Sequence, residues 1–379
     1  MPKVLLGDVA KEHKETCKGS KEGYPIVGLE HLIPEDVNLT QWSTDSEKTF
    51  TKMFRKGNIL FGRRRAYLKK AAVAPFDGIC SGDITVIEAL PDKILPELLP
   101  FVIQNDSLFE FAVGKSAGSL SPRVKWEHLK NYEFELPKLE EQKKLAEVLW
   151  AMYETKCSYK KLIQATDELV KSQFIEMFGD PATNSKGLPV YKVGELCDVT
   201  KLAGYEYTEY IHYQDSGDVV MIKGLNVKEK HLKLDDISYI NAEVSDSLPR
   251  SQLHEGDVVM TYIGINLGDV AIVDGNHRYH LAPNVAKISV KNKASLIPEF
   301  LVNQIYYSRD KFTRNAGNTA KAVLNMEKIR KIDVFLPDVD AQRNFIEFVE
   351  QSDKSKFELE NALNELTATY KRIISENLG

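Results

Sequence analysis

Hydrophobic residues in two long stretches of the chain recur at alternating steps of four and three residues. The first stretch runs from Leu145 to Met177 and the second from Phe345 to Ile373, 200 residues later. Both stripes have a lysine at the same place, Lys156 and Lys356, and neither stretch contains proline or glycine. Heptad spacing predicts helices that each pack against another helix. The favoured partner is the other long helix; the alternative is that each stripe packs on its own neighbouring globular segment.

The rest of the sequence is duplicated with the same period of about 200 residues. The matching pairs are Leu6–Val9 with Val193–Leu196, Ile26–Leu29 with Ile222–Leu225, Phe54–Leu60 with Leu253–Val259, Leu95–Leu99 with Ile297–Leu301, Phe134–Pro137 with Val334–Pro337, and Glu141–Lys144 with Ala341–Asn344. Because these matches keep the same order with an almost constant offset, they indicate two copies of one fold.

Each copy begins with short β-type runs and ends with a long helix. The runs are Asn58–Gly62, Lys70–Ala74 and Gly82–Glu88 in the first copy, and Asp257–Ile263, Asp269–Val273 and Asn284–Val290 in the second. Gly, Pro, Asn and Asp separate them. The predicted fold class is α+β, with two mixed modules and two long helices. We place the first module at 1–138, a central spacer helix at 139–180, the second module at 181–338 and a C-terminal spacer helix at 339–379.

The helices have a predictable end and a predictable length. Phe178-Gly179-Asp180-Pro181 is a typical helix stop, with glycine followed by proline. About 38 helical residues at ~1.5 Å each span roughly 57 Å. If the helices pair antiparallel, an approximate two-fold axis would relate the modules. The paired helices would then hold them one to two turns of B-DNA apart.

Composition places the chain among ordinary globular proteins. It has 379 residues, of which 43% are hydrophobic and 28% are charged. It has no membrane-length apolar run, and no secretory-type stretch follows Met1. The cysteines are widely spaced, without a zinc pattern; they are Cys17, Cys80, Cys157 and Cys197. We therefore expect a cytoplasmic protein with reduced thiols and no membrane partner.

The net charge of −5 argues at first against a nucleic-acid partner. However, the excess of acidic residues lies mainly in the two helical segments, 139–180 and 339–379, whereas both modules are close to neutral. Local basic patches on the modules could therefore still bind DNA.

The catalytic signatures that we considered all fail. Gly57–Arg64 resembles a phosphate-binding loop but ends in Arg-Arg where Lys-Ser/Thr is required. His277 and His280 lack a third metal ligand at a useful spacing. Asp83 and Glu88 lack the lysine of a nuclease site. The sequence therefore predicts no catalytic centre and no metal site.

Two basic segments of the first module are suited to binding DNA. Gly62–Lys70 forms a turn between two strands, and Gly114–Lys125 is small, basic and expected to be flexible. Arginine can donate two hydrogen bonds to guanine, and lysine can bind phosphate. The candidate contacts are Arg63, Arg64, Arg65, Tyr67, Lys69, Lys70, Lys115, Ser116, Ser119, Arg123 and Lys125. The alternative is that both segments are ordinary solvated loops.

The corresponding segments of the second module differ in chemistry. The turn Thr261–Gly268 has no Arg or Lys, and tyrosines gather at 205, 207, 210 and 213. The candidate contacts here are Tyr205, Tyr207, Thr261, Tyr262, Asn266, Arg314, Asn315, Asn318 and Lys321. Because the frame repeats while these loops differ, we expect the two modules to recognise different DNA sequences.

The order of these segments resembles the specificity subunit S (HsdS) of type I restriction-modification systems. The resemblance rests on Gly57–Arg65, Leu136–Lys144, Phe174–Pro181 and Leu336–Arg343. It implies two target recognition domains, each reading half of a split double-stranded DNA sequence. It also implies two methyltransferase (M) subunits docked on the helices and motor-nuclease (R) subunits that join for cleavage. Those partners, rather than this chain, would bind S-adenosylmethionine, ATP and Mg²⁺.

Two other functions stay open at this stage. The chain could be a protein-interaction scaffold of two β-rich modules on a coiled coil, which the net acidity and the lysine-free second turn favour. An independent enzyme such as a nuclease would need a catalytic cluster that the sequence does not reveal.

Overall fold

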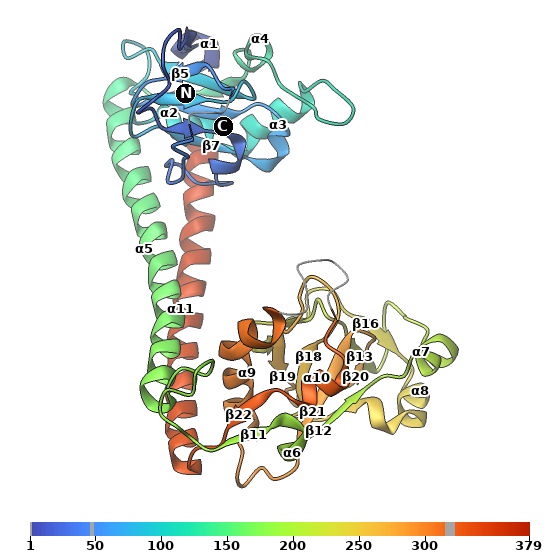
Figure 1. Ribbon diagram of the computed structural model, residues 1–379. Coiled ribbons are helices and arrows are strands. Elements are labelled where there is room, and N and C mark those ends of the chain that lie inside the picture. Colours follow the sequence, from blue (N-terminus) through green and yellow to red (C-terminus); the bar gives the residue numbers. More distant parts are fainter. Residues whose placement is uncertain (1, 46–48, 315–322) are drawn as a thin grey trace. The chain divides into compact units, whose positions relative to one another are not determined.

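The computed structural model describes residues 2–45, 49–314 and 323–379, and the chain divides into two compact units. Unit 1 comprises Met1–Ile163 with Glu358–Gly379, and unit 2 comprises Gln164–Phe357. Each unit therefore holds one β-rich module and a part of both long helices (Figure 1).

Unit 1 contains two small sheets and several short helices. Its elements are β1 Lys3–Leu5, α1 Leu6–Val9, β2 Ala10–Glu12, β3 Glu15–Thr16, β4 Ile26–Val27, β5 Lys52–Phe54, β6 Ile59–Gly62, β7 Ala71–Val73, β8 Gly78–Cys80, β9 Ile84–Ala89, α2 Leu99–Ile103, α3 Asp106–Gly114, α4 Trp126–Leu129 and β10 Glu133–Glu135. One sheet has the order β2-β9-β6-β7, and the other has the order β3-β5-β8-β4. A separate antiparallel ladder joins β1 to β10.

Unit 2 repeats this arrangement and adds to it. Its elements are β11 Val190–Lys192, α6 Val193–Leu196, β12 Cys197–Lys201, α7 Gly204–Tyr210, β13 Val219–Ile222, β14 Val227–Lys228, β15 His231–Leu232, β16 Ser238–Ile240, α8 Ala242–Ser247, β17 Gln252–Leu253, β18 Val258–Thr261, β19 Val270–Ile272, β20 Arg278–Leu281, β21 Val285–Val290, α9 Pro298–Thr313, α10 Met326–Arg330 and β22 Asp333–Phe335. Its sheets have the orders β12-β21-β18-β19 and β16-β13-β20-β17.

The two units share one topology in their first sheets, whereas their second sheets differ in one edge strand, which is β3 beside β5 in unit 1 and β16 beside β13 in unit 2. The order β12-β21-β18-β19 matches β2-β9-β6-β7 strand for strand, and β11 pairs with β22 as β1 pairs with β10. In the second sheets, β13 runs parallel to β20 as β4 runs parallel to β8. The strands predicted from the sequence correspond to β6, β7 and β9 and to β18, β19 and β21. Helix α7 and the β14–β15 hairpin belong to unit 2 alone among the described residues.

Equivalent turns before β6 and β18 show why the repeated sequence gives a repeated fold. Gly57 and Gly256 have φ angles of 87° and 83°, which favour glycine. The next residue closes each turn, because the side chains of Asn58 and Asp257 each accept a backbone hydrogen bond at 2.8 Å.

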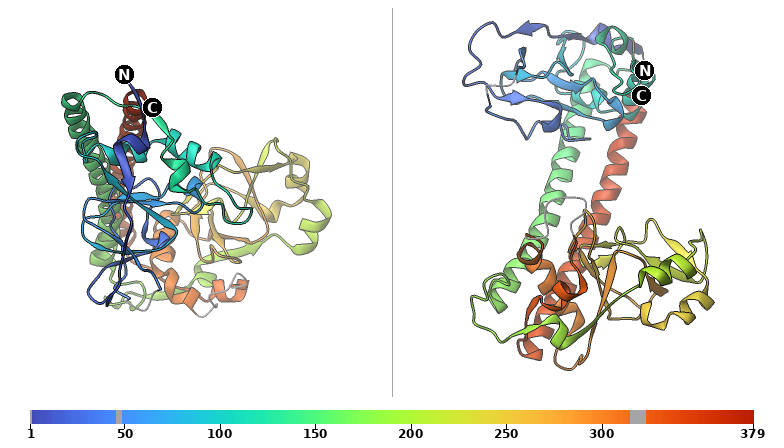
Figure 2. Two further views of the ribbon diagram at one scale, coloured as in Figure 1. Left: turned by 90° about the horizontal axis from the view of Figure 1, so that it is seen from above. Right: turned by 45° about the vertical axis from the view of Figure 1, so that its right-hand side comes forward.

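The two long helices predicted from the heptad stripes are confirmed as α5 (Leu139–Phe178) and α11 (Val339–Leu378). Every described stripe position is buried or half-buried. In unit 1 the first part of α5 contacts the last part of α11, and in unit 2 the last part of α5 contacts the first part of α11. The helices therefore pair antiparallel, and they lie side by side within each unit (Figures 1 and 2). Gly179, at φ 83°, follows the last residue of α5 as predicted.

The alternative interpretation, in which each stripe packs on its neighbouring globular module, is also partly correct. Each long helix packs on a module as well as on the other long helix. The core of unit 1 includes Leu149 of α5 and Tyr370 of α11 together with residues of the sheet. The core of unit 2 likewise includes Phe174 and Phe345. Neither helix is surrounded on all sides, and one stripe on each helix contacts both the partner helix and the module.

A buried glutamine joins each module to the long helix that follows it. The side-chain oxygen of Gln142 accepts a hydrogen bond from Leu95 N at 2.8 Å, and its amide donates to the Pro137 carbonyl at 2.9 Å. Gln342 accepts from Ile297 N at 2.9 Å, and its amide donates to two carbonyls at 2.9 Å. These bonds give a physical reason for the repeated Leu-Pro-x-x-x-x-Gln pattern, because the glutamine fixes where the helix leaves the module.

Candidate nucleic-acid interface

The basic segment of unit 1 connects β6 to β7, as the sequence predicted for a turn between strands. Arg65 and Tyr67 are exposed, and Arg63 and Arg64 are half-buried. Arg65 has a φ of 55°, a conformation in the left-handed region that is uncommon for arginine. The connection is therefore an ordered structure that presents several cations.

The second basic segment packs against the first. Arg65 N donates to the Pro122 carbonyl at 2.8 Å, and Val124 N donates to the Arg63 carbonyl at 3.0 Å. Ala117 and Arg123 exchange two further backbone hydrogen bonds. The prediction that this segment is flexible is therefore wrong at its base, because the backbone is hydrogen-bonded there. Ser119 and Leu120 are exposed at its tip.

The two segments meet on one carboxylate, Asp83. Arg123 donates to Asp83 from Nε at 2.7 Å and from Nη2 at 3.4 Å, and Arg64 donates from Nη1 at 3.4 Å. Arg64 also donates to the hydroxyl of Ser121 at 3.0 Å. The Arg123 guanidinium holds the pKa of Asp83 below its ordinary value, and Asp83 raises the pKa of Arg123. We call Arg63, Arg64, Asp83 and Arg123 the basic cluster.

Several other predicted contacts of unit 1 are engaged within the protein. Lys69 is ion-paired with Asp106 at 2.6 Å. Lys70 donates to the Leu29 carbonyl at 2.8 Å. The hydroxyl of Ser116 donates to the Ala112 carbonyl at 2.7 Å, whereas Lys115 and Lys125 are exposed. The structure therefore brings the arginines together and draws Lys69 and Lys70 into internal contacts.

Unit 2 builds the same frame with neutral side chains. Tyr262 N donates to the Asn284 carbonyl at 2.9 Å, as Arg63 N donates to the Asp83 carbonyl at 3.0 Å. Ile263 is bridged to Val323, as Arg64 is bridged to Arg123. We call Tyr262, Ile263, Asn284 and Val323 the neutral cluster. It occupies the equivalent position in the fold, and none of its residues is charged.

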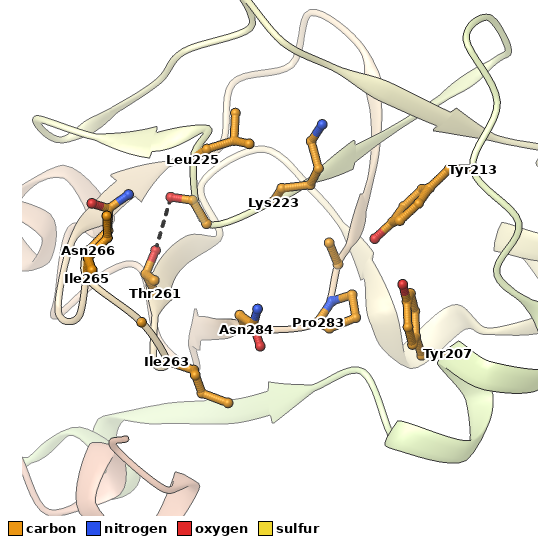
Figure 3. Close-up of a pocket in the computed structure, with 13 residues that line it drawn as sticks. Tyr207, Tyr213, Lys223, Leu225, Thr261, Ile263, Ile265, Asn266, Pro283 and Asn284 are labelled. Atoms are coloured by element: carbon orange, nitrogen blue, oxygen red, sulfur yellow. Dashed lines mark hydrogen bonds between the residues drawn. The ribbon is translucent and has the colours of Figure 1, made fainter. Parts of the chain in front are cut away.

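A pocket of about 520 Å³ opens beside the neutral cluster. Figure 3 shows Tyr207 and Tyr213 on one side of it and Asn266 and Ile265 on the other. The two tyrosine rings lie 6.1 Å apart at 52°, and burial raises the pKa of Tyr213 to about 12. The full lining is Tyr207, Tyr213, Lys223, Gly224, Leu225, Thr261, Ile263, Gly264, Ile265, Asn266, Ala282, Pro283 and Asn284.

The charge of this pocket is low because its lysine has internal partners. Lys223 donates to Asp236 at 2.9 Å and to Ser238 at 3.2 Å. Thr261 donates to the Gly224 carbonyl at 3.5 Å on the pocket floor (Figure 3). Ile265 is 87% exposed at the rim. The pocket therefore offers aromatic, apolar and amide groups to a ligand.

The other predicted contacts of unit 2 have different positions. Tyr262 is 7% exposed and packs in the core, so its ring is not presented to a ligand. Tyr205 is 66% exposed on α7, and Arg314 is exposed at the end of α9. Asn315, Asn318 and Lys321 lie outside the described residues.

Asp83, Tyr213 and Asn284 were not predicted as binding residues, although the structure places them at these positions. Aligning Ser81–Asp83 with Ala282–Asn284 through the repeat would have paired Asp83 with Asn284. The sequence offered no signal that Asp83 meets Arg123, since that contact joins distant segments.

The features that resembled catalytic motifs have structural roles. Gly57–Arg64 is a tight turn followed by strand β6. His280 is fully buried in β20, beneath the surface. Among the described residues, no group of three His, Cys, Asp or Glu side chains could hold a metal ion. In that same part of the chain, the helices are too short or too polar to cross a membrane.

The fold and its two clusters define a class of protein: two recognition modules of similar topology, with different surface chemistry, carried on paired helices. A family model described as the type I restriction modification DNA specificity domain matches residues 3–166 and 186–368. The chain belongs to this family. It is a type I restriction-modification specificity subunit, whose function is DNA sequence recognition.

Known proteins agree with this assignment. A Methanocaldococcus jannaschii protein, assigned as the specificity subunit of the type I restriction enzyme MjaX, is 20% identical over 90% of this chain and 81% of its own length. The S subunit structure of a type I restriction-modification system from M. genitalium is 13% identical, with a TM-score of 0.56 over 100% of this chain and 96% of its own. A structure concerned with complex assembly of the type I R-M system is 15% identical, with a TM-score of 0.56 over 99% and 97%. These structures show that the fold is shared.

Proposed function

We propose that this chain directs methyltransferase and nuclease subunits to a bipartite, asymmetric DNA sequence. The modules at 1–138 and 181–338 act as target recognition domains, and each reads one half of the sequence. The observation that supports this most directly is that one backbone frame holds the charged basic cluster in unit 1 and the uncharged neutral cluster in unit 2. Side chains of different chemistry on the same frame select different bases.

The proposed contacts divide into phosphate-binding and base-reading groups. Exposed cations such as Arg65, Lys115 and Lys125 suit phosphate, where they add affinity without sequence preference. In unit 2, Tyr207, Asn266 and Asn284 suit base edges. Tyr67, Ser119, Tyr205 and Arg314 complete the proposed surface. Thr261, which the sequence also suggested, is only 2% exposed and is not part of it.

The partners follow from the helices and from the family. Val148, Leu169 and Phe357 are 48%, 53% and 62% exposed on α5 and α11. These side chains are candidate contacts for methyltransferase subunits on the two helices. We propose that those subunits and the nuclease subunits bind S-adenosylmethionine, ATP and Mg²⁺, and that this chain performs no catalysis. The role of the paired helices in spacing the half-sites stays a prediction.

Exchanging one module tests the proposal. The chain is produced with its methyltransferase partner, and methylated adenines are mapped on genomic DNA. Replacing residues 1–138 with the module of another specificity subunit should change one half of the methylated sequence and leave the other half unchanged. A chain that copurifies with no methyltransferase, or a change in both halves, would contradict the proposal and favour the scaffold function.

Single substitutions in unit 1 refine the test. Arg64→Ala and Arg65→Ala should lower methylation of the cognate site, and the difference from wild type should be largest at low salt, because salt weakens the phosphate contacts that the variants lack. Lys18→Ala, at an exposed lysine after β3, is the matched control and should have little effect. Equal rates for Arg64→Ala, Arg65→Ala and Lys18→Ala at low salt would remove both arginines from the interface.

A further inference from the structure

The basic cluster has a geometry that suits one particular base. Arg123 holds Asp83 with its Nε and Nη2 atoms, which form the side edge of the guanidinium. A guanidinium has five N–H groups, so both N–H groups of Nη1 and one of Nη2 are left. Among the described residues, none accepts a hydrogen bond from Nη1 of Arg123. The end edge of this side chain is therefore available for two parallel hydrogen bonds.

The backbone around Asp83 fixes the position of that edge. Asp83 N donates to the hydroxyl of Ser81 at 3.2 Å, and the Asp83 carbonyl accepts from Arg63 N at 3.0 Å. The Asp83 side chain is 23% exposed, whereas that of Arg123 is 42% exposed. An ordered carboxylate thus orients an accessible arginine, so little side-chain freedom remains to be lost on binding.

Unit 2 shows that these ion pairs are not needed for the fold. Its equivalent positions hold Ile263, Asn284 and Val323, and the same backbone hydrogen bonds form without any charge. Val124 N donates to Arg63 in unit 1 as Leu324 N donates to Tyr262 in unit 2, at 3.0 and 2.9 Å. Since the neutral version folds alike, the charges of the basic cluster have another role.

The following inference rests on the proposed function. We propose that Arg123 reads a guanine in the half-site bound by unit 1, with Asp83 as its positioning residue. The end edge of Arg123 donates to O6 and N7 of guanine in the major groove, a pair of acceptors that adenine, cytosine and thymine do not offer. Arg64, held by Asp83 and Ser121, lies beside Arg123 and binds the neighbouring base or phosphate. The neutral cluster cannot make this contact, so unit 2 does not select guanine in this way.

The test uses the chain assembled with its methyltransferase partner and DNA duplexes that carry the mapped recognition sequence. Each guanine of the unit 1 half-site is replaced in turn by 7-deazaguanine, which lacks the N7 acceptor. One replacement should weaken binding to the wild-type complex, and replacement of that base pair by A·T should weaken it roughly 5- to 150-fold. In the Arg123→Ala complex the same replacements should have no further effect.

Two variants separate base reading from folding. Asp83→Asn should lose discrimination against the A·T duplex while keeping its affinity for unrelated DNA, because a negative charge is removed. The triple variant Arg64→Ile, Asp83→Asn, Arg123→Val reproduces the neutral cluster. It should fold, as circular dichroism and thermal unfolding will report, and should lose guanine selection in the unit 1 half-site only.

The outcomes distinguish this inference from the proposed function. A unit 1 half-site without guanine would overturn the inference, as would 7-deazaguanine effects that are equal in the wild-type and Arg123→Ala complexes. A uniform loss of affinity for all sequences in Arg123→Ala would make it a phosphate contact and leave the proposed function intact. A wild-type complex with no sequence preference would instead contradict the proposed function.

Discussion

The two units differ in the side chains that fill the contact between the long helices and the module. In unit 2 this region is aromatic: Phe174, Phe178, Phe300 and Phe345 are at most 1% exposed, with ring centroids 4.9–6.3 Å apart. The equivalent residues of unit 1 are aliphatic, namely Ile374, Leu378, Leu98 and Leu145. Apolar character is thus kept at these four positions while the size and shape of the side chains change.

The paired lysines of the helices differ in the same way. Lys156 lies over the ring of Tyr370, with Nζ 4.4 Å from the ring centroid, and burial lowers its pKa. Lys356 instead forms an ion pair with Asp167 at 2.8 Å. Equivalent positions therefore keep a residue type but not its partner. The comparison teaches that the duplication preserves the backbone frame, whereas side-chain partners have diverged at the helices and at the clusters alike.

The largest expected effect comes from the aromatic group of unit 2. Phe345→Ala should lower the free energy of unfolding of unit 2 by about 3–5 kcal/mol, because a fully buried ring leaves a cavity. Leu145→Ala, at the equivalent half-buried position of unit 1, should cost only about 1–2 kcal/mol. Urea unfolding followed by hydrogen exchange in β18 and β21, compared with β6 and β9, measures both. Equal losses would show that the aromatic group adds nothing over the aliphatic one.

The next effect concerns the glutamines that start the long helices. Gln342→Ala breaks three hydrogen bonds and should lower the unfolding free energy by about 2–4 kcal/mol, whereas Gln142→Ala breaks two and should cost about 1–3 kcal/mol. Gln342→Met is the control, since it keeps the apolar stem and removes the hydrogen bonds. If thermal unfolding shows that the methionine variant is as stable as wild type, the glutamine acts by packing alone.

The sequence predicted the elements whose signals are local. Heptad spacing indicated α5 and α11, Gly179 and Pro181 marked the end of α5, and the repeat aligned β6 with β18 correctly. The second sheet of each unit was not predicted, because strands such as Glu15–Thr16 and Ile26–Val27 are too short to show an alternating pattern.

The sequence predicted which segments form the candidate site but not which side chains contact one another there. Arg64 and Arg123 were both expected at the surface, yet their shared carboxylate depends on strand pairing far apart in the chain. The burial of Tyr262 was missed for a similar reason: its ring joins a core that forms only when β18, α9 and α10 pack together. Residue type and turn position do not show which side of a strand faces the core when a connection departs from regular alternation.

The smallest expected effect is a difference between the two units in how their stability depends on pH. His280 is fully buried, with Nδ1 3.0 Å from the Leu281 carbonyl, and its equivalent in unit 1 is Ile79, which is also fully buried. Burial lowers the pKa of His280 below its value of about 6.5 in the unfolded chain. Between those two values the unfolded chain binds more protons than the folded one. The stability of unit 2 is therefore complete above pH ~6.5 and falls by at most about 1.4 kcal/mol for each pH unit below it, until the folded pKa is reached.

Hydrogen exchange in β20 at pH 7.5, 6.5 and 5.5, corrected for the intrinsic rate, measures this loss. The wild-type chain should lose protection in β20 as the pH falls, while β8 of unit 1, which holds isoleucine at this position, should lose less. His280→Gln should flatten the pH dependence of β20, whatever its effect on stability at neutral pH, because the titrating group is gone. If β20 keeps the same slope in this variant, other groups cause the acid sensitivity, and the difference between His280 and Ile79 is one of packing alone.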